Sequence, residues 1–354
     1  MKRYLNCIIA EFYKLSRGKK KYIFLILLII WFTLGTMLYS LDLVEFEEKE
    51  YNGEYGIRRY ENFEELKEYI GATMTDIEQI KLEYIETQRF SPQSREEQVS
   101  FDAKIMLLTR QLNVYQYLLD NEIQAKEYYD ATFLTQRDTN ASVFWTLYSI
   151  PLYMILAMFI YFASMSINSD IETGVAVIEY TQGVSRLQII ICKTLSLILL
   201  ASILAIISCL ISFILGAILG GTNAEIVFAT DVSVFSLNYG EILGLYLGTS
   251  LLAIFSTILF SVSISIFIKS KGLSAILSFC VLLFSKYLFQ FLLNIGVKAY
   301  NFWFANFIML TDVFTNHSPL ITFNIPYVVL LCILSPVLLL WLASIYHLKR
   351  DINY

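Results

Sequence analysis

Charged residues are scarce in this chain of 354 residues. They make up 16% of it, whereas an average soluble domain carries about 25%. Hydrophobic residues account for 56%, and the mean hydropathy is +0.58. This balance excludes a disordered chain and argues against an ordinary cytosolic enzyme.

Several sequence motifs of enzymes and nucleotide-binding proteins are also missing. No G-x-x-x-x-G-K-[ST] run occurs, which excludes ATP binding through a P-loop. Neither H-E-x-x-H nor G-x-S-x-G occurs, so a zinc protease and a serine nucleophile elbow are unsupported. The cysteines and the two histidines, His317 and His347, show no zinc-ligand spacing, so we expect no metal site. Basic residues do not cluster with aromatic ones, which argues against nucleic-acid binding.

Long apolar runs dominate what is present. A helix of about 20 apolar residues crosses the ~30 Å hydrocarbon layer of a membrane. The chain holds six such runs, at Tyr22–Leu41, Phe144–Ile167, Ile189–Leu219, Ile242–Ile268, Leu273–Leu293 and Ile325–Tyr346. The sequence therefore predicts an all-α polytopic membrane protein, with one transmembrane helix within residues 22–42 and five within 144–354.

The basic residues predict the orientation of these helices. Seven lysines and arginines lie within residues 2–21, ahead of the first span. A six-span count places Lys269 and Lys271 on the same side, so we expect both termini in the cytoplasm. Abundant Ile, Lys, Asn, Tyr and Phe fit a bacterium with an AT-rich genome, which favours a bacterial cell membrane.

The charge is divided unevenly along the chain. Residues 43–143 hold 21 acidic and 11 basic side chains, a net charge of −10, and the remainder carries +5. This segment has no cysteine, so no disulfide stabilises it. Two apolar stripes run through it, Phe63 to Tyr84 and Phe101 to Leu119, with spacings that alternate between three and four residues. They predict an extracytoplasmic helical hairpin paired within the chain, although pairing between two subunits is the alternative.

Residues 1–21 contain a shorter amphipathic pattern. Its apolar face comprises Leu5, Ile8, Ile9, Phe12 and Leu15. This period predicts a helix that lies in the inner membrane interface, with its basic residues near lipid phosphates. The alternative is a simple basic anchor next to the first span.

The connection between the second and third spans, residues 168–188, is long for a turn. The residues in it that we expect to couple the chain to a partner protein are Asp170, Glu172, Gly174, Glu179 and Arg186. The stretch from Val175 to Tyr180 is apolar enough to be buried, so we expect a short helix that presses against a cytoplasmic partner. Ser185 is expected to cap the helix of the third span.

One charge lies inside the fifth apolar run. Lys286 shares a helix face with Gln290 and Asn294. An ionisable group at membrane depth costs about 3 kcal/mol and usually faces the bundle interior or water. These residues are candidates for a translocation path, and the alternatives are a structural hydrogen bond or a lysine that reaches toward the surface. The next segment, 294–324, is apolar enough to dip into the outer leaflet.

Glycines at helical spacing mark the outer ends of two spans. Gly216 and Gly220 end the third, and Gly240, Gly244 and Gly248 open the fourth. Small residues one turn apart let helix backbones approach closely, so these two spans are expected to pack together there. Chance spacing is the alternative.

Four features together resemble the six-span permease subunits of ABC exporters of the second membrane-domain class, which have the type V exporter fold. These features are the stretch Ala10–Leu15, the loop from Asp170 through Arg186 to Lys193, the apolar segment before the last span, and the tail Leu348–Ile352. The resemblance covers the whole chain except residues 43–143.

The resemblance implies a function in ATP-driven export of a peptide, drug or lipid-like cargo. Segment 168–188 would be the coupling helix, which contacts a separate ATP-binding subunit. The chain would pair with a second permease, identical or different, catalyse nothing itself, and leave ATP and Mg to its partner. A rival interpretation is a membrane sensor or immunity protein whose acidic outer segment captures a cationic antimicrobial peptide.

Overall fold

The computed structural model describes residues 6–11, 28–36, 62–90, 95–123, 128–130, 140–172, 185–220, 225–229, 234–268, 270–294 and 325–349. Its long helices are α3 (Phe63–Phe90), α4 (Arg95–Asp120), α5 (Asn140–Glu172), α7 (Arg186–Leu219), α8 (Tyr239–Phe267), α9 (Lys271–Asn294) and α11 (Ile325–Lys349). Residues 6–11 and 28–36 form shorter helical stretches. The chain is therefore predominantly helical, as its composition predicts.

Four helices of the described chain are long and apolar enough to cross a membrane. The spans are Leu147–Asn168, Arg186–Leu219, Tyr239–Phe267 and Pro326–Tyr346. They match the second, third, fourth and sixth predicted spans. The predicted first span is described over residues 28–36 alone, and α9 has a shorter apolar stretch, Lys271–Leu282. The first and fifth spans therefore stay predictions, and so does the count of six.

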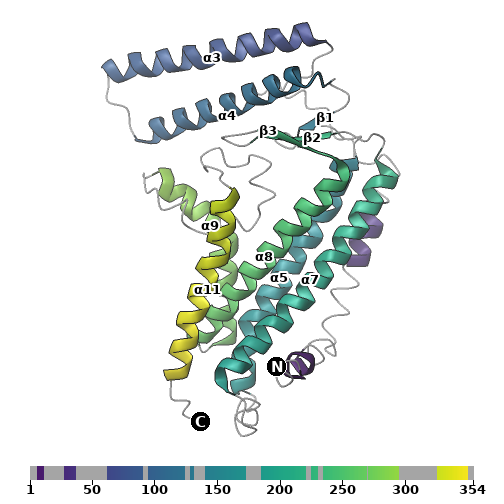
Figure 1. The fold of residues 1–354 in the computed structure, drawn as a ribbon. Coiled ribbons are helices and arrows are strands. Elements are labelled where there is room, and N and C mark those ends of the chain that lie inside the picture. The colour runs from purple at the N-terminus through teal and green to yellow at the C-terminus, as the bar shows by residue number, and fades with distance from the viewer. Residues whose placement is uncertain are drawn as a thin grey trace.

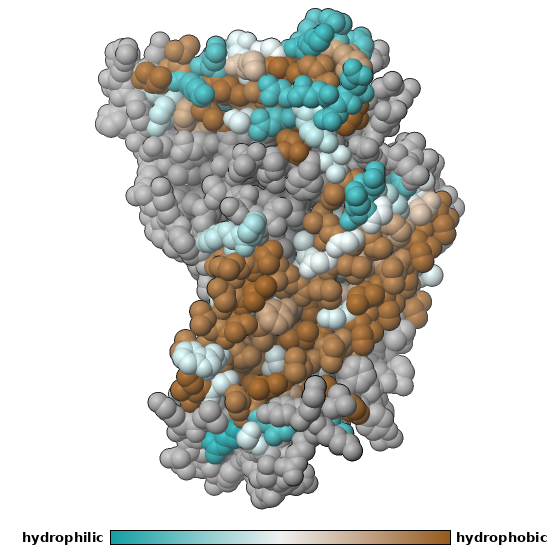
Figure 2. Space-filling model, in the orientation of Figure 1, coloured by the Kyte–Doolittle hydropathy of each residue, from teal (hydrophilic) through white to brown (hydrophobic). Residues whose placement is uncertain are grey.

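The helices α5, α7, α8 and α11 enclose one apolar core (Figure 1). Hydrophobic side chains also cover the outside of this bundle, as expected of helices that face lipid (Figure 2). Small buried residues on α7, such as Ala201 and Ala205, let α5 approach closely. Residues 28–36 lie against α5, where the indole N–H of Trp31 donates to the carbonyl oxygen of Leu147 at 3.3 Å.

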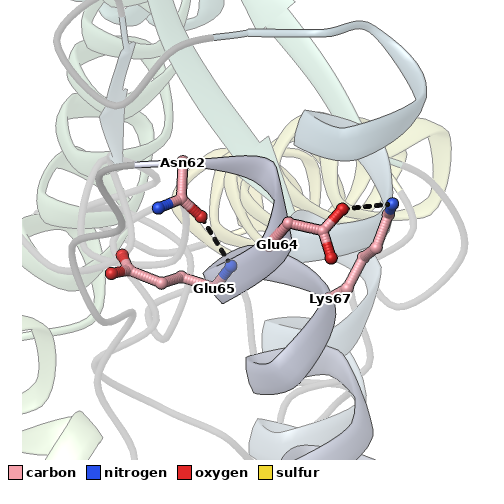
Figure 3. Close-up of polar contacts among 4 residues, drawn as sticks. All are labelled: Asn62, Glu64, Glu65 and Lys67. Carbon is pink, nitrogen blue, oxygen red and sulfur yellow. Dashed lines mark hydrogen bonds and ion pairs between the residues drawn. The ribbon is translucent and has the colours of Figure 1, made fainter.

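The helices α3 and α4 pack against each other at the opposite end from residues 6–11 (Figure 1). The first turn of α3 is capped by Asn62, whose Oδ1 accepts from the Glu65 backbone N–H at 2.9 Å (Figure 3). Next to this cap, Lys67 and Glu64 form an exposed ion pair at 3.2 Å (Figure 3). The cap satisfies a backbone donor that the helix itself leaves free, which explains where α3 begins.

The predicted stripes form the contact between α3 and α4. Tyr84 stacks on Phe101 with ring centroids 3.8 Å apart, and Leu66 packs in one cluster with Tyr115 and Leu118. Both contacts join residues of one chain. Leu118 lies outside the predicted stripe, and it is buried because a second element covers α4.

That second element is a three-stranded sheet, which the sequence analysis did not predict. Its strands are β1 (Tyr128–Asp130), β2 (Glu225–Ala229) and β3 (Val234–Leu237). The central strand β2 runs parallel to β1 and antiparallel to β3, with Val227 opposite Asp130 and Ser236. The described chain is otherwise helical, as expected, and the sheet is an addition in which the acidic segment pairs with the connection between α7 and α8.

The sheet also attaches α4 to the bundle. The Tyr117 hydroxyl donates to Ser236 Oγ at 3.1 Å, and Val234 packs against the α3 and α4 cluster. Because β3 leads directly into α8, the helices α3 and α4 are connected to the membrane-spanning body through strand pairing as well as through the chain.

The glycines at the outer ends of α7 and α8 differ in what surrounds them. A Cβ atom on Gly216 would lie 2.8 Å from the Asn140 carbonyl oxygen, and one on Gly220 would lie 2.5 Å from the Asn140 nitrogen. No described atom lies within 4 Å of the Cβ position of Gly240, Gly244 or Gly248. The two spans do pack together at their outer ends, where Tyr239 of α8 stacks on Phe213 of α7 with ring centroids 4.3 Å apart. The glycines of α7 accommodate Tyr239 and the start of α5 there, whereas those of α8 take no part in this contact.

Candidate functional site at the end of α5

Polar contacts surround the last two turns of α5. Ser274 Oγ of α9 donates to the Ser164 carbonyl oxygen at 3.2 Å. Asn168 Nδ2 donates to the carbonyl oxygen of Ile268, at the end of α8, at 2.7 Å. Since alternate residues of a helix point about 200° apart, this segment can contact neighbours on several sides. We call these contacts, together with those of Lys193 below, the α5-end cluster.

The strongest member of the cluster is a buried ion pair. The Lys193 ammonium group on α7 contacts the Asp170 carboxylate on α5, and the two side chains are 4% and 10% exposed. Lys193 Nζ also donates to the Ser166 carbonyl oxygen at 3.1 Å. A buried charge is tolerated when it is paired and hydrogen-bonded, so these contacts explain how the ammonium group lies inside the bundle.

The start of α7 is fixed by local contacts. Ser185 Oγ accepts from the Gln188 backbone N–H at 3.2 Å, which confirms the predicted cap. Ser196, one turn beyond Lys193, donates to the Ile8 carbonyl oxygen at 3.1 Å. The short helix 6–11 is thereby joined to α7 next to the α5-end cluster.

The five residues predicted to couple the chain to a partner fall into two groups. Asp170 is buried, Glu172 is the last residue of α5, and Arg186 is the first residue of α7. Gly174 and Glu179 lie outside the described residues. The described part of the segment therefore consists of two helix ends that the α5-end cluster holds together. Contact with an ATP-binding subunit stays a prediction.

The other predicted sites are described in part. Lys286, Gln290 and Asn294 belong to α9, but their side chains lie outside the described part, as does the structure of residues 295–324. In the N-terminal helix, Ile8 is half-buried and Ile9 is 57% exposed. The rest of that predicted face, Leu5, Phe12 and Leu15, is not described.

Sequence reasoning did not single out Lys193 or Asn168 as site residues, although Lys193 ends the loop that carries the family resemblance. Lys193 is the one charge in the apolar run Ile189–Leu219, which is the same signal that marked Lys286. It was passed over because it lies near the start of its run, where a lysine usually extends to the interface.

A set of buried hydroxyl groups was also missed. Tyr148 on α5 donates to Ser250 on α8 at 2.6 Å. Five other buried hydroxyls of the described residues have no hydrogen-bond partner: Ser208, Ser212, Thr257, Ser261 and Ser278. Within the same part of the chain, no group of three or more His, Cys, Asp or Glu side chains could hold a metal ion.

Comparison with known proteins places this arrangement in context. The sequence model of a family described as "ABC-2 family transporter protein" matches residues 5–346. The match begins ahead of the short N-terminal helix and ends within α11, so it includes the acidic segment and the α5-end cluster. No curated protein and no solved structure gave a match.

Proposed function

We propose that this chain, which belongs to the ABC-2 transporter family, couples ATP hydrolysis by a partner to export of a peptide, drug or lipid-like cargo. It is a multi-pass membrane protein and the non-catalytic permease component of such a transporter. ATP is bound by a separate ATPase subunit, with which permeases of this family act.

The proposed topology has six spans in a bacterial cell membrane, with both termini in the cytoplasm. The helix 6–11 and the C-terminal end of α11 lie at the same end of the bundle, opposite α3 and α4 (Figure 1). An even number of spans accounts for this placement. Two such permeases, identical or different, would form the membrane part of the transporter, and α3, α4 and the sheet would stand outside the membrane.

Segment 168–188 is the proposed contact with the ATPase. The observation that carries this proposal is the α5-end cluster, which joins α5 to α7, α8 and α9 at the described end of this segment. A displacement of the segment by the ATPase would reach these helices together. Nucleotide binding would then favour one of two arrangements of the bundle.

Co-purification tests this function directly. The full-length chain should retain a separate ATP-hydrolysing subunit, and the double variant Glu172→Lys/Glu179→Lys should lose it or lose the stimulation of its ATPase activity. Glu78→Lys, an exposed reversal on the distant helix α3, is the matched control. Unchanged assembly and stimulation in the double variant would exclude segment 168–188 as the contact.

The proposed translocation path includes Lys286, Gln290 and Asn294 on α9. Lys286→Leu should abolish ATP-dependent efflux from proteoliposomes, measured with a panel of fluorescent peptides, drugs and lipids. Lys271→Leu, at the start of the same helix, serves as the control. Efflux that survives Lys286→Leu would leave the lysine with a structural role.

A second candidate function belongs to the acidic outer segment. On α3 the side chains of Glu68, Glu78 and Asp76 are exposed, as are the apolar side chains of Met74 (43%) and Leu82 (61%). A cationic amphipathic peptide matches both properties, so the segment is proposed to capture one, as cargo or as a signal.

Titration of the full-length protein with a synthetic Lys/Leu amphipathic peptide tests this capture. Binding should weaken between 50 mM and 500 mM salt, because charge attraction is screened. A peptide with Gln in place of Lys should bind far less at both salt concentrations. Equal binding of the two peptides would remove the charge-based explanation.

A further inference from the structure

We infer that Lys193 is a positioning residue that clamps the last turn of α5 to α7, so that both helices follow the coupling segment as one unit. This inference rests on the proposed function, because it concerns how movement of segment 168–188 enters the bundle.

The first argument is geometric. Lys193 contacts two groups of α5 that are four residues apart, the Asp170 carboxylate and the Ser166 carbonyl oxygen. Residues at this spacing lie one above the other on one helix face. The lysine therefore spans a complete turn of α5, and it does so from the second turn of a different helix.

The second argument concerns the ends of helices. The last carbonyl groups of a helix have no partner within it, and its C-terminal end attracts cations and disfavours anions. Asp170 lies two residues before the end of α5, where a carboxylate is unfavourable by itself. Lys193 supplies the compensating charge for this carboxylate. Its second bond, to the Ser166 carbonyl oxygen, ties the preceding turn to the same ammonium group. The final turn is thereby held as helix up to the point where the coupling segment begins.

The third argument is that the neighbouring polar contacts of α5 cannot replace Lys193. Asn168 joins α5 to the end of α8, and Ser274 joins it to α9. Neither contact reaches α7. On the opposite side of the bundle, Ser256 of α8 donates to the Cys332 carbonyl oxygen of α11 at 2.8 Å. Lys193 is thus the polar contact of the α5-end cluster that joins α5 to α7.

The experiment measures whether α7 follows the ATPase. Spin labels at Ile214 on α7 and Leu330 on α11, both 56% exposed, are placed in a background without native cysteines. In the assembled complex, vanadate trapping with ATP should shift the distance between the labels. Lys193→Met should lose this shift while the ATPase still co-purifies and hydrolyses ATP.

Three further variants separate positioning from a general loss of structure. Lys193→Arg keeps the charge and should restore the shift, as should the exchange Asp170→Lys/Lys193→Asp. Thr194→Ala, which removes a neighbouring hydroxyl bonded to its own helix, should behave as the wild type. If Lys193→Met does not assemble with the ATPase, the exchanged pair tests the clamp instead. A role through the ion pair alone predicts that Asp170→Lys/Lys193→Asp recovers both the assembly and the shift in distance.

The outcomes are distinguishable. A wild-type shift in Lys193→Met, with the ATPase bound, would overturn the clamp and leave the proposed function standing. Failure of the exchanged pair to recover the shift would also overturn it. Absence of any co-purifying ATPase from the wild type would remove the proposed function, and the clamp with it.

Discussion

Buried hydroxyl groups in this bundle differ in whether they are paired. Ser250 accepts from Tyr148 at 2.6 Å and donates to the Tyr246 carbonyl oxygen at 2.6 Å. Ser261, on the same helix, is fully buried and has no partner. Because an unpaired buried polar group costs about 1–3 kcal/mol, these two serines should respond oppositely to removal of the hydroxyl.

Ser250→Ala should lower the stability of the detergent-solubilised protein by about 1–2 kcal/mol, because it removes the buried hydrogen bond that the Tyr148 hydroxyl donates to Ser250. Ser261→Ala should leave the stability unchanged or raise it. The midpoint of thermal unfolding of the two variants is the measurement. A drop of equal size in both would show that Ser261 gains a partner in the membrane-embedded protein.

The ion pair of Lys193 predicts a different pattern. Lys193→Met leaves the Asp170 carboxylate buried without its partner, which should cost about 3–5 kcal/mol. The double variant Asp170→Leu/Lys193→Met removes both charges and should recover most of that loss. Unfolding of the wild type, Lys193→Met and the double variant in urea and detergent measures this recovery. A double variant as unstable as Lys193→Met alone would contradict it.

At the scale of helices and strands, local sequence patterns predicted helices but not the sheet. The stripes of α3 and α4 and the four confirmed spans follow from periodicity and apolar length, which each segment carries by itself. The sheet could not be predicted in this way. Its strands have three to five residues, and β1 pairs with β2 almost a hundred residues later. Gln111 and Val114 are buried beside Leu118 on α4, outside the stripe that the period marked.

The packing of α7 on the start of α5 gives a prediction at this scale. The backbone of Gly220, at φ −77° and ψ 132°, suits any residue, so the effect of Gly220→Ala is purely steric. The new methyl group meets the backbone of Asn140 and should destabilise the protein by about 1–3 kcal/mol. Gly244→Ala meets no described atom and should gain up to about 1 kcal/mol from helix propensity. Opposite shifts in the unfolding midpoint are expected, and two shifts of the same sign would disprove this packing.

At the scale of the molecule, α5 and α7 are joined twice. The α5-end cluster holds one end, and Asn140 with Gly220 holds the other. The sequence located the loop between these helices, since it lies between two long apolar runs and its acidic residues are a local feature. It did not reveal that Asp170 points inward to Lys193, because the two residues are 23 positions apart in separate helices and each span was considered by itself.

The sheet predicts how the outer helices are held. Val227 lies in the central strand, so Val227→Pro removes a backbone donor that a neighbouring strand uses. We expect faster hydrogen exchange in β1, β3 and α4, with α5 and α8 unchanged. Val227→Thr, which keeps the backbone N–H and the branched side chain, is the control. Unchanged exchange in α4 would mean that its attachment does not depend on the sheet.

The parallel pairing of β1 and β2 also determines the order in which the protein can be completed during synthesis. When the ribosome has made α3, α4 and β1, the partner strand does not yet exist, because α5 and α7 must be made and inserted first. Until then β1 has no neighbour on the side that β2 will occupy. A nascent chain stalled before residue 225 would therefore hold α3 and α4 with one of their supports still unmade, and it would be most open to proteases during that interval.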